Sequence, residues 1–326
     1  MSDTSRPTAS KRQFGRRAVV AGLSSAAASA IAAPALAQFR FGFGGSDSDS
    51  GSGLNLDLGR ILQGAQDLFE GLSLGEDDEV RIGNELFGRL VDKSGGAYGN
   101  AKAQAGLRRF ADPLIATSGR AKLPWEVVLI NDNTLNAWAL PGGKIAVNKG
   151  VLRYAADEAE LAAVLSHEIG HAELSHGIKQ MRSKSFNKGL TALGREAIMA
   201  EMGSGDAYMT DKLIDALEDP LFDMVTSGYS RGAEREADQH ILTVFGRTGH
   251  DPSRAANFFK TMLQVTPRET EATNSLFSTH PDTQERIEKI EATARGMPAP
   301  TSPPPTDGFA AAKKSFPTRR RFRRRA

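Results

Sequence analysis

A histidine and glutamate pattern near the middle of the chain carries the strongest chemical signal. His167, Glu168 and His171 form an H-E-x-x-H stretch. On a helix that advances about 100° per residue, histidines four apart project from one face a single turn apart, so two imidazoles can bind one metal ion. Glu168 then lies beside the first histidine, where its carboxylate can take a proton from a metal-bound water. The stretch therefore predicts two metal ligands and a general base on one helix.

A catalytic zinc site usually has three protein ligands and leaves a fourth position to water, so a third ligand is needed. His176 is five residues beyond the second histidine, about 140° round a continuous helix, and we expect it to be a surface or helix-end residue. Glu234 is the better candidate, because Asp238 faces the same side of a helix and can accept the free N–H of a ligand histidine. Glu236 and His240 share this spacing and remain the rival pair.

Hydrophobic periodicity predicts an α+β fold that is mostly helical, with a small antiparallel sheet beside the H-E-x-x-H helix. The main helices are expected over 76–93, 101–117, 157–176, 231–245, 251–262 and 281–290, with weaker ones in 54–74, 190–202 and 211–217. Strands are expected over 125–130, 136–140 and 144–148, the last two joined in a hairpin by Pro141-Gly142-Gly143.

The first 37 residues have the composition of an export signal. A basic region precedes the alanine-rich apolar stretch 18–33, and Ala35-Leu36-Ala37 supplies a small-x-small cleavage pattern. The apolar stretch is shorter than the roughly 20 residues that a membrane span needs. Arg16-Arg17 resembles a twin-arginine signal, so both the twin-arginine and the general secretory routes stay open.

Composition divides the rest of the chain. Residues 38–75 form a glycine-, serine- and aspartate-rich linker with a weak helix, 76–297 a folded domain, and 298–326 a Pro-rich and Arg-rich tail that we expect to be disordered. The net charge of +2 combines two basic ends with a body of about −9, which gives no reason to expect nucleic-acid binding. The absence of cysteine excludes disulfides and thiolate metal ligands.

Several motifs occur together in the order found in one known family. They are H-E-I-G-H at 167–171, Ser230-Arg231-x-x-Glu234-x-x-Ala237-Asp238, the upstream Asn136-Ala137-Trp138-Ala139-Leu140-Pro141-Gly142-Gly143, and Thr279-His280-Pro281 with Arg286. With them, the region 76–290 resembles metallopeptidase family forty-eight of the gluzincins. This family includes the CAAX prenyl endopeptidase, the heat-shock membrane protease and soluble periplasmic relatives that act on outer-membrane proteins. The resemblance extends to the catalytic domain only.

The resemblance implies a gluzincin zinc-peptidase domain with one Zn²⁺ per chain and endopeptidase activity. His167, His171 and Glu234 are the expected ligands, Asp238 supports a ligand histidine, and Glu168 is the general base. These assignments make the chain a metalloprotease whose substrates are proteins or peptides.

Other roles are left open. The donor that stabilises the oxyanion has three candidates, namely His280, Tyr229 and Arg286. His280 has two further possible roles, as a regulatory ligand or as a helix cap. The strand 144–148 is the expected edge for an extended substrate, with Asn136 and Gly143 lining the cleft, or else an ordinary supporting hairpin.

The function expected is an exported endopeptidase of the bacterial periplasm that acts on unfolded or misassembled proteins in envelope quality control. The alternative is a chaperone-like or binding protein whose metal site is capped by residues 177–229 and weakly active. In addition, the Arg-rich end could contact anionic membrane or polymer, or be a solvated tail.

Overall fold

A computed structural model describes residues 74–183, 211–265, 280, 283–301, 304 and 307–316 of the protein. The expected export signal, most of the linker and its weak helix, the helix expected in 190–202 and the Arg-rich end lie outside the described residues. The chain divides into units 1–54 and 55–326, and all described residues belong to the second unit.

The fold is mostly helical with one small sheet, as the sequence predicts. The helices are α2 (Glu76–Lys93), α3 (Ala101–Ile115), α4 (Lys149–Tyr154), α5 (Glu158–Glu173), α6 (His176–Met181), α9 (Asp211–Ser227), α10 (Arg231–Thr248), the 3-10 turn η1 (Pro252–Arg254), α11 (Asn257–Val265), α13 (Thr283–Ala294) and α14 (Phe309–Lys313). Asp251 and Pro252 open the short η1 turn instead of a longer helix. Pro220 lies inside α9, where buried Leu217 and Leu221 hold the helix against the body.

The sheet has three strands, β1 (Glu126–Ile130), β2 (Ala137–Leu140) and β3 (Lys144–Asn148), in the order β1-β3-β2. β2 and β3 form the expected antiparallel hairpin, but β1 is parallel to β3, so the sheet is mixed and the fully antiparallel expectation is wrong. The reason is that β3 lies between β1 and β2: it runs opposite to β2 and is thereby aligned with β1. β3 is therefore the central strand and β2 an edge strand, which corrects the expectation that 144–148 is the edge.

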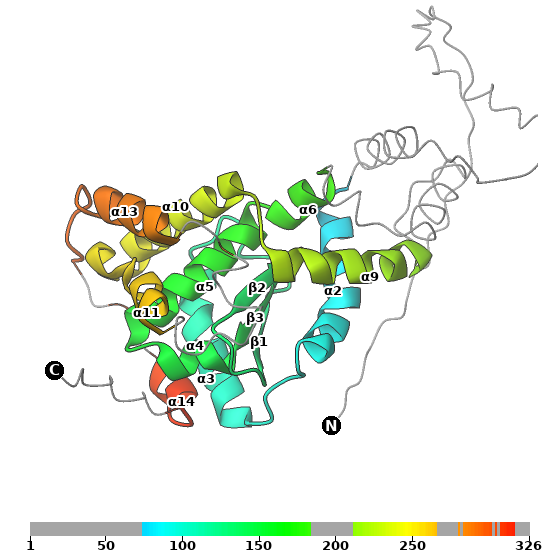
Figure 1. Ribbon diagram of the computed structural model, residues 1–326, viewed down its shortest axis with the longest axis horizontal. Helices are drawn as coiled ribbons and strands as arrows, with labels where there is room; N and C mark the ends of the chain where they lie inside the picture. Colours follow the sequence, from blue (N-terminus) through cyan, green and yellow to red (C-terminus); the bar gives the residue numbers. More distant parts are fainter. Residues whose placement is uncertain are drawn as a thin grey trace, which may run out of the picture. The chain divides into compact units, whose positions relative to one another are not determined.

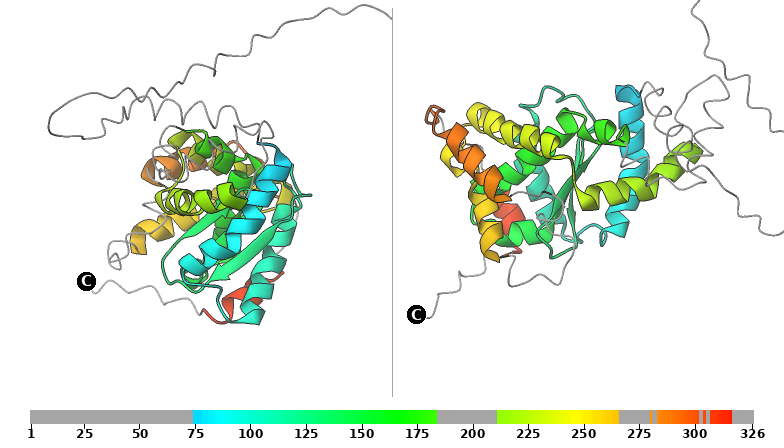
Figure 2. Two further views of the ribbon diagram at one scale, coloured as in Figure 1. Left: turned by 90° about the vertical axis from the view of Figure 1, so that its right-hand side faces the viewer. Right: turned by 45° about the horizontal axis from the view of Figure 1, so that its top comes forward.

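Helices cover both faces of this sheet (Figures 1 and 2). Successive strand side chains point to opposite faces, and in β1 this alternation separates two cores. Val127 and Leu129 pack with α3 and α5 on one face, whereas Ile130 packs with α2 and α9 on the other, with the half-buried Val128 against it. The sheet is thus the middle of three layers, and α5 lies directly against it.

The helix α5 is buried almost all round because its apolar residues do not alternate with charges. Asp157 caps its first turn by accepting hydrogen bonds from the N–H groups of Ala159 and Glu160, as the sequence predicts. Every residue from Ala159 to Ala172 is buried, including the whole H-E-x-x-H stretch. Such a helix needs partners on every side, and it finds them in the sheet, α3, α10 and α11.

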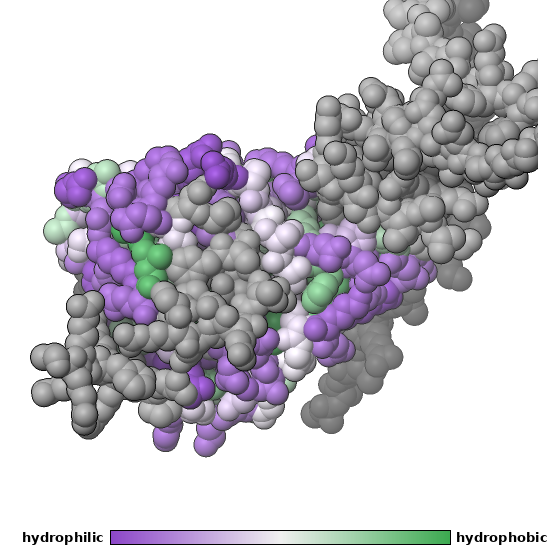
Figure 3. All heavy atoms as spheres, viewed as in Figure 1, coloured by the Kyte–Doolittle hydropathy of each residue, from purple (hydrophilic) through white to green (hydrophobic). Residues whose placement is uncertain are grey.

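The surface of the described part is mainly hydrophilic in the view of Figure 3. Leu263 is the only large hydrophobic side chain that is exposed among the described residues, at 36%. None of the helices in the described ranges combines the length and the apolar character required to cross a membrane.

The segment before the Arg-rich end is ordered, which corrects the expectation of disorder for part of 298–326. Helix α14 lies on α3, with Ala312 fully buried and Phe316 against Tyr98. Lys313 donates hydrogen bonds to carbonyl oxygens of Leu152 and Ala155 at the end of α4. The Pro-rich and Arg-rich composition of 298–326 as a whole gives no sign of these few anchoring residues.

We expect Gly106→Ala to destabilise the protein by about 1–3 kcal/mol, because a Cβ at position 106 would lie 2.4 Å from the backbone nitrogen of Ala312 and force α14 away. Gly88→Ala in α2 is the matched control, since a Cβ there meets nothing within 4 Å. It should be neutral or stabilising by up to about 1 kcal/mol. Urea unfolding of both variants measures the difference, and equal stabilities would contradict the packing of α14 on α3.

Candidate metal centre

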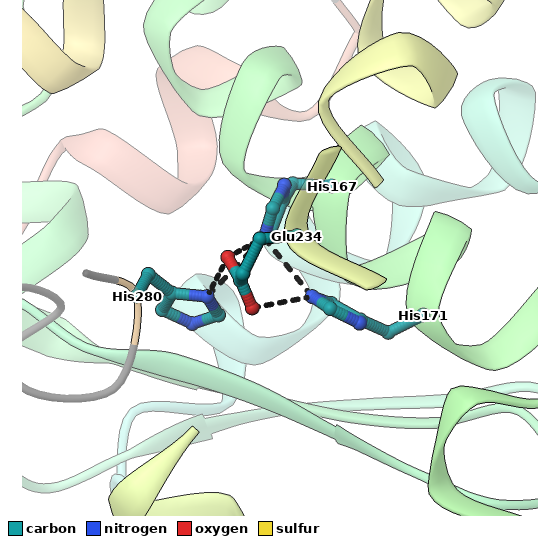
Figure 4. Close-up of side chains that lie close together, drawn as sticks. All are labelled: His167, His171, Glu234 and His280. Carbon is teal, nitrogen blue, oxygen red and sulfur yellow. Dashed lines mark hydrogen bonds and ion pairs between the residues drawn. The ribbon is translucent and has the colours of Figure 1, made fainter. Parts of the chain in front are cut away.

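Four buried side chains from three parts of the chain converge on one point (Figure 4). His167 and His171 come from α5, Glu234 from the first turn of α10, and His280 from just before α13. Each offers one ligand atom, and these atoms all lie within 4.8 Å of one another. Among the described residues this is the one group of histidines and carboxylates that could hold a metal ion.

The distances within this cluster are short. The Nε2 atoms of His167 and His171 are 3.0 Å apart, and Nδ1 of His280 lies 3.3 Å from Nε2 of His167. One carboxylate oxygen of Glu234 is 2.7 Å from Nδ1 of His280, and the other is 3.5 Å from Nε2 of His171. The side chains thus turn their electron-donating atoms toward a common centre.

Gly170 allows α10 to come close enough to supply Glu234. A Cβ at position 170 would lie 2.9 Å from Cβ of His240 and 3.3 Å from Cα of Ala237, so any larger residue would push the helices apart. His240 then joins them, with Nδ1 2.8 Å from the carbonyl oxygen of Ser166 and Nε2 2.9 Å from a carboxylate oxygen of Glu173. The rival ligand pair of Glu236 and His240 lies outside the cluster.

Asp238 and Arg286 support the cluster from behind. An oxygen of Asp238 is 3.2 Å from Nδ1 of His167, as the four-residue spacing from Glu234 predicts. Arg286 on α13 binds Asp238 with two nitrogens, at 2.8 and 2.6 Å, and approaches Glu234 at 3.1 Å. The guanidinium of Arg286 also lies over the ring of Phe259, so this aromatic contact and the two carboxylates together fix its position.

Glu168 lies beside the cluster and is fully buried. Neither of its carboxylate oxygens has a hydrogen-bond partner among the described residues, and Nε2 of His280 is 3.8 Å away. Burial raises the pKa of Glu168, with opposing charges from His280 and His167 too weak to cancel it. A buried carboxylate without a hydrogen bond is costly and calls for a functional explanation.

The electrostatics of the cluster fit a bound cation. Three buried carboxylates, those of Glu168, Glu234 and Asp238, face the single buried guanidinium of Arg286. Burial raises the pKa of Glu234, but the charge of His280 and hydrogen bonds from the histidines outweigh it and hold that pKa well below its usual range. The residues present would therefore accommodate a divalent metal ion.

The pKa values of the two motif histidines are shifted in opposite directions. Burial lowers the pKa of His171 well below its usual value. Burial acts on His167 in the same direction, but its hydrogen bonds to Asp238 and Glu234 prevail and raise its pKa to about 9. Because a metal replaces the proton of a ligand histidine, metal binding at this point must release protons.

His176 is a helix-end residue, as one of the two alternatives predicts, but it is buried beside the cluster, which corrects the expectation that it lies at the surface and points elsewhere. The helix α5 ends at Glu173, and Ser175 has a left-handed backbone with φ 51°, so α6 starts at His176 in a new direction. Its ring turns back to place Nδ1 2.9 Å from Nδ1 of His171. The expected position applies only to one continuous helix, and the break at Ser175 is why it is wrong.

The edge strand β2 runs beside the cluster, and two of its outward-facing groups are already engaged. The hydroxyl of Tyr229 donates a hydrogen bond of 3.0 Å to the carbonyl oxygen of Ala139, and its ring stacks on His171 with centroids 4.2 Å apart. Oδ1 of Asn136 accepts from the N–H of Ala137. Gly143 lies in the turn before β3, packed against Trp125, so of the two expected cleft residues only Asn136 binds this edge.

A helix that presents two histidines and a glutamate, crossed by a second helix that adds a carboxylate, has the arrangement of a metallopeptidase metal site. Comparison with known proteins agrees. The model of Peptidase family M48 matches residues 101–294, which include every residue of the cluster. The chain belongs to peptidase family M48, as the motifs predict.

Individual relatives show how far the similarity extends. The chain is 27% identical over 246 residues to the β-barrel assembly-enhancing protease of Yersinia pestis, covering 73% of this chain and 50% of that protein. It is 31% identical over 185 residues to the mitochondrial metalloendopeptidase OMA1 of Schizosaccharomyces pombe, covering 57% and 51%. With the metalloprotease YcaL of Escherichia coli it shares 24% over 234 residues, covering 72% and 87%. The chain thus spans about half the length of the first relative.

We expect Arg286→Met to lower the free energy of unfolding by about 3–5 kcal/mol in metal-free protein, because it leaves Asp238 and Glu234 buried without their cation. Arg89→Met is the control, since the exposed Arg89 pairs with the exposed Asp215 and the half-buried Glu218, and these ion pairs at the surface should contribute less than about 1 kcal/mol. Urea unfolding checks both. Equal losses would show that Arg286 does not neutralise the cluster.

Proposed function

We propose that the protein is a zinc-dependent endopeptidase. The observation that carries the proposal is the placement of Glu168, fully buried and with no hydrogen bond to any described residue, beside a cluster of three histidines and a carboxylate. Zinc is the metal that this combination of imidazole and carboxylate ligands suits in hydrolytic sites. Membership of peptidase family M48 supports the same reaction.

In this proposal His167, His171 and Glu234 hold the ion, and Asp238 fixes the ring of His167 by accepting its Nδ1–H. The ion would supply a lowered pKa for water and polarise the substrate carbonyl. Glu168 takes the proton of the attacking water and passes it to the leaving amine, for which its raised pKa is suited.

His280 has the position of a fourth ligand or of an oxyanion donor, since its ring lies between Glu234 and Glu168. The other two donor candidates have different engagements. Arg286 is held by Asp238, and the hydroxyl of Tyr229 donates to β2. We therefore favour His280 for contact with the reacting carbonyl.

We expect Glu168→Gln to reduce peptide hydrolysis by roughly 10²–10⁴-fold while zinc content stays near one per chain, because the change removes the base and keeps the ligands. Glu234→Ala should lower zinc content itself, and Glu288→Ala, on the exposed face of α13, should change neither. Metal analysis and digestion of an unfolded protein give both readouts. Full activity in Glu168→Gln would end the proposal.

Substrate would bind as an added strand on β2. An extended peptide that pairs with this edge needs the carbonyl of Ala139 and the N–H of Ala137, and it would then lie over the metal ligands. In the described conformation Tyr229 and Asn136 occupy those groups. The ligand residues are also buried, with exposed fractions of 1–2% for the three histidines. Substrate access therefore requires that Tyr229 leave β2.

We expect Tyr229→Phe to raise hydrolysis of an unfolded protein by up to about 5-fold, because one hydrogen bond of about 1 kcal/mol no longer competes with substrate. The phenyl ring keeps the stacking on His171. Tyr98→Phe, whose ring packs on Phe316 away from the cluster, is the control and should have no effect. A large loss of activity in Tyr229→Phe would instead assign the hydroxyl to oxyanion stabilisation.

The setting that we propose is the bacterial periplasm, with unfolded or misassembled envelope proteins as substrates. The signal-like composition of residues 1–37 supports export, and the similarity to β-barrel assembly-enhancing proteases supports the substrate class. The Arg-rich end would add contact with anionic membrane or polymer.

The second candidate is a chaperone-like binding protein with a capped and weakly active metal site. The closed edge of β2 is the observation that favours it. The two candidates differ in one measurable respect. A binding protein would keep its biological activity in Glu168→Gln, whereas an endopeptidase would lose it.

A further inference from the structure

We propose that His176 is a positioning residue of the metal centre: it fixes the ring of His171, and Glu236 in turn fixes His176. The inference rests on the proposed metal site, because it takes His171 to be a ligand. It adds two residues, neither of which belongs to the cluster itself, and it gives a role to a histidine that helical spacing alone would place elsewhere.

The contacts form a chain that leads away from the cluster. Nδ1 of His171 lies 2.9 Å from Nδ1 of His176, and Nε2 of His176 lies 3.1 Å from a carboxylate oxygen of Glu236. Both rings are buried, with exposed fractions of 1% and 2%. Glu236 reaches the surface, where Nζ of Lys179 is 3.8 Å from the same oxygen. We call this series of side-chain contacts the His171–His176–Glu236 relay.

The chemistry of the three groups gives each hydrogen bond a direction. The carboxylate of Glu236 only accepts, so Nε2 of His176 must carry the hydrogen and donate. A neutral His176 then has a bare Nδ1, which accepts from Nδ1–H of His171. This leaves the lone pair on Nε2 of His171, the atom that faces His167 and Glu234. The relay therefore selects the tautomer of His171 that can bind a metal.

The backbone is built to bring His176 to this position. Ser175 adopts the left-handed region, which a residue with a side chain rarely occupies because its Cβ makes this conformation unfavourable. Its hydroxyl accepts from Arg120 at 2.7 Å and donates to the buried Glu79 at 3.1 Å, and Arg120 pairs with Glu79 at 2.8 Å. Side chains from outside α5 and α6 thus hold the break between the two helices.

The residue after His176 is equally constrained. A Cβ at position 177 would lie 2.8 Å from Cγ of Pro141, in the turn between β2 and β3, so only glycine lets α6 begin here. The turn and the anchored break leave the ring of His176 little freedom. Such a fixed second residue is what a ligand histidine requires if its orientation is to be retained when the metal leaves.

The relay also distinguishes the two motif histidines. His167 meets a carboxylate directly, at 3.2 Å from Asp238, whereas His171 meets one only through a second imidazole. Loss of Asp238 should therefore weaken metal binding more than loss of Glu236. Loss of His176 removes the group that accepts the hydrogen bond of His171. Its effect on metal binding should be smaller than that of losing Asp238 and larger than that of losing Glu236.

The test measures zinc dissociation from the purified full chain at neutral pH, by transfer to an excess of a coloured chelator. We expect His176→Leu to release zinc about 10–100-fold faster than wild type, the range found when partners of ligand histidines are removed. His176→Asn, which keeps an acceptor near the position of Nδ1, should restore the rate to within a few-fold of wild type. Glu236→Ala should accelerate release by a few-fold.

His250→Leu is the matched control, since His250 is also buried and hydrogen-bonded, to Thr248, but lies outside the cluster and the relay. It should leave the rate of zinc release unchanged. If His176→Leu does not fold, the contrast of His176→Asn and Glu236→Ala with wild type still carries the test. Equal rates in wild type, Glu236→Ala and both His176 variants would overturn the relay while leaving the metal site intact. A wild-type chain that binds no zinc would overturn the proposed function, and the relay with it.

Discussion

The close crossing of α10 over α5 at Gly170 is the constraint on which the centre depends. Glu234 lies more than sixty residues from His167 in sequence, and it reaches the histidines only because nothing larger than hydrogen stands between the helices. The same crossing places Asp238 behind His167 and seats His240 between Ser166 and Glu173. The absence of a side chain at position 170 thus determines where Glu234, Asp238 and His240 lie relative to the histidines of α5.

Burying these polar side chains costs free energy, so the fold must hold each of them in one particular position. Carboxylates and histidines that exclude water interact strongly, so each must have a partner or a task. Arg286 neutralises part of the negative charge, and its guanidinium lies over the ring of Phe259. Glu168 is the exception, because neither of its oxygens has a hydrogen bond within the part of the chain that the structure describes. Its cost is understandable only if the stability of the surrounding helices offsets it and the group serves chemistry.

Much of this could be predicted from the sequence where local pattern decides the outcome. The helix 76–93 and the strand 144–148 have the predicted ends, because a glycine-containing turn follows the helix and another precedes the strand. The spacing of Glu234 and Asp238 also places both on one face, since they lie on a single regular helix. These features depend on neighbours in sequence, which a pattern records.

The failures share a different cause. The direction of β1 relative to β3 depends on which strand fills a gap, and strand periodicity carries no direction. His176 was misplaced because Ser175, a residue without the usual glycine signal, breaks the helix under the influence of Arg120 and Glu79. The anchoring of α14 was hidden by the prolines and arginines around it. In each case distant side chains decide a local conformation.

Tyr229 has a consequence that reaches beyond its two contacts. The same side chain stacks on a metal-site histidine and holds the strand edge on which substrate would pair. Suppose that a metal ion bound at the cluster, or a substrate bound at β2, shifts Tyr229. Each ligand then changes the affinity of the protein for the other, and thermodynamic linkage requires that the two factors be equal. Metal binding and substrate binding would then be coupled through one aromatic ring, and the metal affinity of the protein would depend on the concentration of its substrate.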